Sequence, residues 1–253
     1  MKISIVQPDL DWEDKGANME KLDGLIEPLY GSTDIVVLPE MFSTGFTMNT
    51  DVAEEHYGTT FSWMKKHATA GDFGICGSYI VGEKGKFYNR FVFVSPGPDL
   101  YYDKRHLFSI GDEDKTYTKG NSRLVFSFRE FRIAAFVCYD LRFPVWSRNR
   151  DEYDLAIYVS SWPSARIEVW NTLLKARAIE NQCYVAGSNR VGTDGNGVAH
   201  SGMSQVINPR GEKIRSAESC SDCVVSAEIS IEELKNFRSK FNTLKDADDF
   251  SVY

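Results

Sequence analysis

The chain has 253 residues, of which 42% are hydrophobic, and this predicts one sizeable core and a single domain over residues 1–253. A formal charge of −7 at pH 7 offers no broad basic surface for nucleic acid or anionic lipid, so we expect a small-molecule partner. The five cysteines do not suggest a disulfide framework, and neither a signal peptide nor an apolar run long enough to span a membrane is evident, which predicts a cytoplasmic protein.

Short β-rich runs alternate with helical patterns along the chain. Strands are predicted at residues 3–7, 35–38, 73–81, 88–94, 132–138, 155–160 and 184–191. The spacing of apolar residues predicts helices at 14–30 and 164–182, each with one buried face, and a last helix near 231–240. No internal repeat or linker marks a domain boundary, so the pattern indicates one sheet-centred α/β fold.

The first candidate for chemistry is Glu40, which follows the apolar strand predicted at 35–38. Ligand sites in α/β folds gather at the carboxyl ends of strands. Burial in such a crevice raises the pKa of a carboxyl group, which would suit Glu40 to take a proton from a thiol and return it to a leaving amine. An exposed carboxylate at a strand end is the alternative that this segment leaves open.

The second candidate is Lys104. Alternation along residues 100–104 places Leu100, Tyr102 and Lys104 on one face of a strand, and a lysine that shares a face with such neighbours is expected to be partly buried. Its ammonium would stabilise a nearby thiolate or the oxyanion of a tetrahedral intermediate. A basic strand end with solvated side chains is the alternative.

The third candidate is Cys138, which the apolar strand at 132–138 delivers to its carboxyl end, where the chain has to turn before Pro144. On a sharp turn of this kind the sulfur is exposed, and the backbone N–H of Tyr139 faces the same space as an oxyanion donor. A buried cysteine that acts as a small apolar residue fits the segment when it is taken alone.

Together these segments resemble the nitrilase superfamily of carbon–nitrogen hydrolases, and the ω-amidase branch in particular. The matching segments are LPE at 38–40, YDKRHLF at 102–108, VCYDLRFP at 137–144, SWP at 161–163, ARAIENQ at 176–182 and SNRVG at 188–192. The resemblance implies a four-layer αββα sandwich that assembles into a homodimer. It also implies a catalytic triad of Glu40, Lys104 and Cys138, with Glu113 as a second active-site glutamate.

The reaction that the resemblance implies is hydrolysis of a small amide through a thioester on Cys138, with release of ammonia and without a cofactor or metal. The implied substrate is 2-oxoglutaramate or a related ω-amide of a 2-oxo dicarboxylic acid, and the implied pocket is lined by Trp162 and Phe46. Ser161 stands where relatives are expected to carry asparagine, so the substrate is less firmly implied than the chemistry. The alternatives are a carbamoylase or aliphatic amidase of the same superfamily, or an inactive binding module with this fold.

Two other sets of residues suggest chemistry of a different kind. A papain-like cysteine–histidine pair would need a histidine beside Cys138, and we interpret all four histidines as ordinary surface or structural residues. They are His56, His67, His106 and His200. Arg142, Arg177 and Glu180 are interpreted as members of ion pairs rather than as substrate ligands.

Two C-terminal features remain open. The spacing of Cys220 and Cys223 is that of half a zinc site or a redox pair, but no second pair accompanies it. The acidic segment 246–253 is either disordered or anchored to a surface by Phe250 and Tyr253. Neither feature predicts a function.

Overall fold

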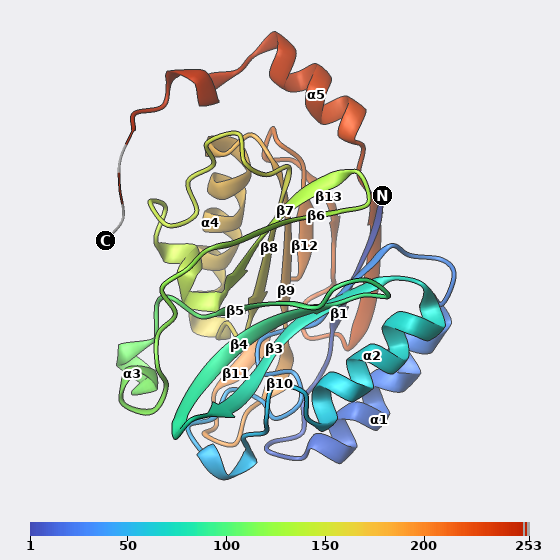
Figure 1. The fold of residues 1–253 in the computed structure, drawn as a ribbon, viewed down its shortest axis with the longest axis vertical. Coiled ribbons are helices and arrows are strands. Elements are labelled where there is room, and N and C mark those ends of the chain that lie inside the picture. Colours follow the sequence, from blue (N-terminus) through green and yellow to red (C-terminus); the bar gives the residue numbers. More distant parts are fainter. Residues whose placement is uncertain (250, 252–253) are drawn as a thin grey trace.

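The computed structural model describes residues 1–249 and 251, and its core is a pair of six-stranded mixed sheets packed face to face (Figure 1). The first sheet has the order β14 (Cys223–Glu228), β1 (Lys2–Gln7), β2 (Ile35–Val37), β3 (Gly74–Glu83), β4 (Lys86–Val94) and β5 (Leu100–Asp103). The second has the order β13 (Lys213–Ser216), β12 (Gln205–Ile207), β9 (Tyr184–Asn189), β8 (Leu155–Ser160), β7 (Phe131–Val137) and β6 (Leu124–Phe128). A separate hairpin pairs β10 (Val191–Thr193) with β11 (Ala199–Ser201).

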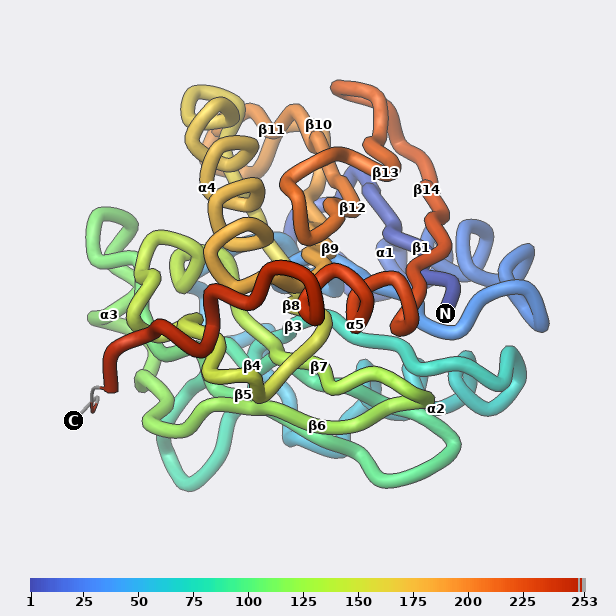
Figure 2. The backbone as a smooth tube through the Cα atoms, turned by 90° about the horizontal axis from the view of Figure 1, so that it is seen from above, coloured from blue at the N-terminus to red at the C-terminus, as the bar shows by residue number. Residues whose placement is uncertain are grey.

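Helices cover the outer faces of both sheets. The α-helices are α1 (Lys15–Ile26), α2 (Thr59–Gly71), α3 (Glu113–Thr116), α4 (Ile167–Glu180) and α5 (Ile231–Lys240). Helices α1 and α2 lie together over the first sheet, and α4 lies over the second (Figure 1). Seen from above, α5 runs across one end of the sandwich (Figure 2). The order of layers is therefore αββα, as the resemblance to the nitrilase superfamily implied.

The pattern of side chains explains why the parallel strands are apolar throughout. Ile35 and Val37 of β2 point into the core between the two sheets, while Val36 points toward α1 and α2. The side chains of a strand alternate between the two faces of a sheet, and here both faces are covered. The central strands therefore appear in the sequence as continuous apolar runs.

The predicted strands are all present, with small differences at their ends. The segment 184–191 is divided between β9 and β10 because Arg190, whose buried side chain reaches the carbonyl of Leu10, interrupts the strand. Helix α2 lies outside the predicted elements. Its buried residues do have helical spacing, but the threonines and lysines between them weaken the pattern, and packing on the first sheet decides the structure.

The fold brings the carboxyl ends of β2, β5, β7 and β8 to one edge of the sandwich. At this edge the backbone N–H of Glu40 donates to the carbonyl of Ser160 (3.4 Å) and so joins the two sheets. Among residues 1–249 and 251, no helix is both long enough and apolar enough to cross a membrane. Phe250 and Tyr253, the two candidate anchors of the C-terminal segment, lie outside the described residues.

Candidate active site

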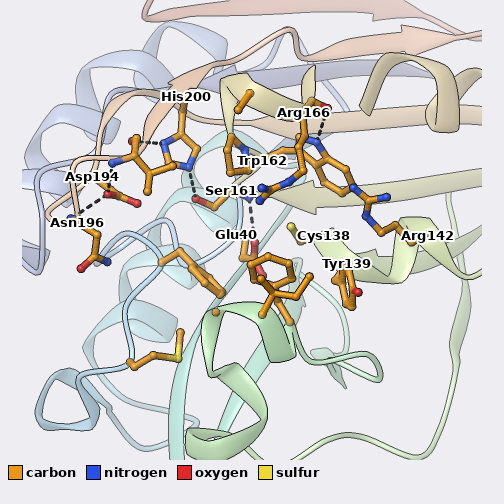
Figure 3. Close-up of a pocket in the computed structure, with 18 of the residues that line it drawn as sticks. Glu40, Cys138, Tyr139, Arg142, Ser161, Trp162, Arg166, Asp194, Asn196 and His200 are labelled. Atoms are coloured by element: carbon orange, nitrogen blue, oxygen red, sulfur yellow. Dashed lines mark hydrogen bonds between the residues drawn. The ribbon is translucent and has the colours of Figure 1, made fainter. Parts of the chain in front are cut away.

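A pocket of about 370 Å³ opens at this edge of the sandwich (Figure 3). The predicted site residues that line it are Glu40, Lys104, Cys138, Tyr139, Trp162 and Phe46. Glu113 lies behind Lys104 and is fully buried. The fold therefore gathers in one place side chains that come from distant parts of the sequence.

Lys104 is the centre of a buried charge cluster. Its ammonium nitrogen Nζ lies 2.7 Å from Glu40 Oε1, 3.0 Å from Glu113 Oε1 and 2.8 Å from Glu113 Oε2. Burial alone lowers the pKa of Lys104, but the charges of Glu113 and Glu40 raise it more, so the net shift is upward. Burial raises the pKa of Glu113, against the opposing effect of Lys104. The lysine is therefore held as a cation between two carboxyl groups.

Both oxygens of Glu40 are held in place. Oε1 accepts from Lys104 and from the side-chain amide of Asn89 (2.8 Å), and Oε2 accepts from the backbone N–H of Ser161 (2.9 Å). Asn89 also donates to Glu113 Oε1 (3.0 Å) and so links the two carboxylates. Sequence reasoning missed Asn89. The sequence pattern that could have revealed it is a polar residue on the same strand face as Phe87 and Phe91, at an inward-facing position of β4.

Cys138 lies on a sharp turn directly after β7. Its φ angle of 44° falls in the left-handed region, which a residue with a side chain adopts only when its surroundings impose it. The turn is braced by Asp140, whose Oδ2 accepts the backbone N–H of Val137 (3.0 Å) and the hydroxyl of Tyr102 (2.9 Å). The strained turn points the sulfur toward Glu40 and into the pocket (Figure 3).

The pKa of the Cys138 thiol is set by burial and by two charged neighbours. Burial raises its pKa, and the carboxylate of Glu40 raises it further, while the ammonium of Lys104 lowers it. The net shift is strongly upward, so the resting sulfur is a protonated thiol. Formation of a thiolate here requires a base, and Glu40 is the carboxylate placed beside the sulfur.

The four histidines lie in different surroundings. His106 Nδ1 lies 2.8 Å from Asp140 Oδ1, and its ring stacks on Phe143, so it braces the loop after Lys104. His67 bonds to Asp23 between α1 and α2, and His56 packs among aromatic rings. Only His200 is among the residues that line this pocket in the described part of the chain.

His200 and Ser161 are in contact with each other in the lining of the pocket. Its Nε2 lies 3.2 Å from Ser161 Oγ, and its Nδ1 lies 3.0 Å from the carbonyl of Val198. Burial, followed by the charge of Arg190, lowers the pKa of His200 to about 4. The ring is therefore neutral at pH 7, and because Nδ1 has to donate to a carbonyl, Nε2 accepts from the serine hydroxyl.

The three residues interpreted as ion-pair members separate into two groups. Arg177 pairs with Glu180 (2.9 Å) and donates to the carbonyl of Leu141 (2.6 Å) behind the turn that carries Cys138. Arg142 instead lines the pocket, with its guanidinium carbon 5.1 Å from the centre of the Trp162 ring. Among the described residues Arg142 forms no salt bridge with a carboxylate of its own chain, so the part of the ion-pair interpretation that concerns a subunit-facing partner stays a prediction.

The C-terminal cysteine pair has no metal-site geometry. Cys220 is exposed, and Cys223 is half-buried at the start of β14. Within residues 1–249 and 251, no three potential ligands of the His, Cys, Asp or Glu type gather in one place. Neither cysteine is among the residues that line the pocket.

Comparison with known proteins identifies the family. The family model described as carbon-nitrogen hydrolase matches residues 2–239. The chain is 45% identical to the omega-amidase YafV of Escherichia coli K12, over 100% of this chain and 99% of that protein, and 31% identical to a 2-oxoglutaramate amidase of Bacillus subtilis, over 96% of each. A solved carbon–nitrogen hydrolase superfamily protein from Xanthomonas campestris, with an arsenic adduct in its active site, has a TM-score of 0.98 and 40% identity and covers 100% of this chain and 99% of its own. The chain therefore belongs to the carbon–nitrogen hydrolase family, which makes it a hydrolase of C–N bonds other than peptide bonds.

Proposed function

We propose that the protein is an ω-amidase that hydrolyses 2-oxoglutaramate, or a related monoamide of a 2-oxo dicarboxylic acid, to the acid and ammonia. The observation that carries this proposal is the buried cluster of Glu40 and Lys104 beside the Cys138 thiol in one pocket. The similarity to an omega-amidase and to a 2-oxoglutaramate amidase supports the substrate class.

In the first half of the reaction, Cys138 Sγ attacks the amide carbonyl while Glu40 takes the thiol proton. The carbonyl π electrons move to oxygen, and a tetrahedral oxyanion results. When this intermediate collapses, the C–N bond breaks and Glu40 returns the proton to the departing nitrogen, so ammonia leaves. In the second half, Glu40 takes a proton from water as the water oxygen attacks the thioester carbonyl. When the second tetrahedral intermediate collapses, the C–S bond breaks, the acid is released, and Glu40 returns the proton to Cys138 Sγ.

The oxyanion is stabilised by Lys104 and by the backbone N–H of Tyr139. An ammonium has three N–H donors, and the three short contacts of Lys104 all go to carboxylate oxygens. If one N–H is shared between the two oxygens of Glu113, a third N–H is available for the oxyanion. We therefore assign to Glu113 the task of orienting Lys104, with Asn89 fixing both carboxylates.

The alternatives from the sequence differ from this proposal in substrate or in activity. A carbamoylase would cleave an N-carbamoyl amino acid, an aliphatic amidase would accept an uncharged amide, and an inactive binding module would release no ammonia. We further propose that the protein acts as a single domain, as a homodimer in the cytoplasm, and that Trp162 and Phe46 form the substrate-contacting walls of the pocket.

The proposal is tested by ammonia release across a substrate panel. We expect the highest kcat/KM for 2-oxoglutaramate, lower values for N-carbamoyl amino acids, simple amides and nitriles, and a loss of at least about 10⁴-fold in Cys138→Ser. Mass spectrometry of the quenched wild type should show an acyl group on Cys138. A higher kcat/KM for carbamoyl compounds or simple amides would contradict the proposed substrate class. Substantial activity in Cys138→Ser would show that Cys138 is not the nucleophile.

A further inference from the structure

Two guanidinium groups face the pocket without an acidic partner. Arg142 and Arg166 both line it, and among the described residues neither forms a salt bridge with a carboxylate. The acidic side chains nearby have other partners. Glu40 is bonded to Lys104, and Asp194 Oδ1 accepts the backbone N–H groups of Asn196 and Val198 in a turn (2.9 Å each).

The two arginines are placed differently. Arg142 is half-buried and lies beside the Trp162 ring, at the side of the pocket in Figure 3. Arg166 is held at its backbone by Trp162, whose indole N–H donates to the Arg166 carbonyl (2.9 Å). Its side chain points toward the space above Glu40 and Cys138, and its guanidinium carbon lies 5.4 Å from the centre of the Phe108 ring.

Arg166 contacts Trp162 on one side of the pocket and Phe108 on the other. Trp162, which holds its backbone, directly follows Ser161, the donor to Glu40 Oε2. Phe108, which its guanidinium approaches, donates its backbone N–H to Glu113 Oε2 (2.6 Å). The guanidinium is therefore positioned from both sides by residues adjacent to the charge cluster, although its own side chain is exposed.

We propose that Arg166 binds the free carboxylate of the substrate and so determines the preference for amides of dicarboxylic acids. The inference deepens the proposed function and rests on it. A guanidinium matches a carboxylate with two parallel hydrogen bonds, and Phe46, Phe108 and Trp162 are apolar residues that line the same pocket. Arg142 has a different task, which is to hold the Trp162 ring in place.

The test compares two substrates that differ only in charge. The variants Arg166→Gln, Arg166→Lys and Arg142→Gln are assayed with succinamate and with its methyl ester, which keeps the amide and loses the negative charge. The matched control is Arg210→Gln, because Arg210 also lies over an aromatic ring, Phe237 (4.8 Å), but outside the pocket.

We expect Arg166→Gln to lower kcat/KM for succinamate roughly 10- to 100-fold, mainly through KM, and to change the value for the ester less than about threefold. Arg166→Lys should recover part of the loss, because it keeps the charge without the fork. Arg142→Gln should affect both substrates alike, and Arg210→Gln neither.

Three results would overturn the assignment. Equal losses on the two substrates in Arg166→Gln would mean that this arginine only supports the pocket, and no loss would mean that the carboxylate lies elsewhere. A loss confined to succinamate in Arg142→Gln, but not in Arg166→Gln, would transfer the role to Arg142. A wild type that cleaves the ester as well as the acid would contradict the proposed function before any variant is compared.

Discussion

The floor of the pocket and its rim are built in opposite ways. At the floor, Glu40, Asn89 and Glu113 are completely buried, Lys104 is 1% exposed, and each of them has at least two hydrogen-bonding partners within the cluster. At the rim, Ile110 is 81% exposed and Arg166 is exposed, and the Arg166 guanidinium lies near the Phe108 ring without a carboxylate partner among the described residues.

The residues proposed for bond cleavage thus lie at the floor, and those proposed for substrate selection lie at the rim. Every group at the floor depends on several others, so a change there should reduce activity and stability together. The rim residues depend on few neighbours, so a change there should alter substrate binding with little effect on folding. Substitutions at the floor should therefore have larger effects than substitutions at the rim.

The largest effect is expected for Glu40→Gln, which keeps the shape of the side chain and removes the base. Loss of a general base should lower kcat by about 10²- to 10⁴-fold. The charge of Glu40 raises the pKa of the Cys138 thiol, so its removal should lower that pKa. The rate of alkylation of Cys138, followed by mass spectrometry of its peptide, should therefore reach its midpoint at a lower pH than in the wild type.

A matched control for this titration is Glu152→Gln, a surface residue that pairs with Arg123 outside the pocket. It should leave both the midpoint and kcat unchanged. A midpoint that stays the same or rises in Glu40→Gln would show that Glu40 does not govern the thiol, and the floor would no longer act as one electrostatic unit.

The next effect is expected for Lys104→Ala. Removal of the cation leaves Glu40 and Glu113 buried side by side without a counter-charge, which should lower the free energy of unfolding by about 3–5 kcal/mol. Turnover of the folded variant should fall at least about a hundredfold, because the proposed oxyanion donor is lost. Urea denaturation and ammonia release measure the two effects on one preparation.

Lys115→Ala provides the comparison for that experiment. Lys115 pairs with Asp112 at the protein surface (2.7 Å), and exposed pairs contribute little, so its loss should leave the free energy of unfolding nearly unchanged. If Lys104→Ala and Lys115→Ala have the same free energy of unfolding, the buried charge cluster does not stabilise the fold. The floor would then not differ from the rim in its contribution to stability.

The sequence predicted the floor better than the rim, for a physical reason. Glu40 and Cys138 each follow an apolar strand and Lys104 follows an alternating one, so local patterns place them at the edge of a sheet, and the motifs around them match a known family. The layers of the sandwich follow from the same strands. These features depend on residues that are close in sequence.

The missed residues depend on contacts between distant segments. Asn89 reaches both carboxylates only because β4 pairs with β5 in a register that no local pattern fixes. Arg166 and His200 enter the pocket from a turn and a hairpin that are positioned by the rest of the fold. Pairing of β14 with β1, nearly the full chain length apart, is likewise invisible in local sequence.

The smallest effect is expected at Ile110, at the rim of the pocket. Because this side chain is largely exposed, Ile110→Ala should change the free energy of unfolding by no more than about 0.5 kcal/mol. It should raise KM by up to about threefold through lost apolar contact with the substrate and leave kcat unchanged. Val145→Ala, which removes an exposed apolar residue outside the pocket, should change neither constant.

The reason to measure kcat at this position is the short connection between rim and floor. Ile110 lies in the turn Ser109–Gly111, and the residues on either side of that turn are joined by the bond from the Phe108 N–H to Glu113 Oε2. A fall in kcat of more than about tenfold, with KM unchanged, would mean that the turn transmits its position to Glu113 and hence to Lys104. The rim would then take part in orienting the catalytic cation, and substrate choice and chemistry would not be separable in this pocket.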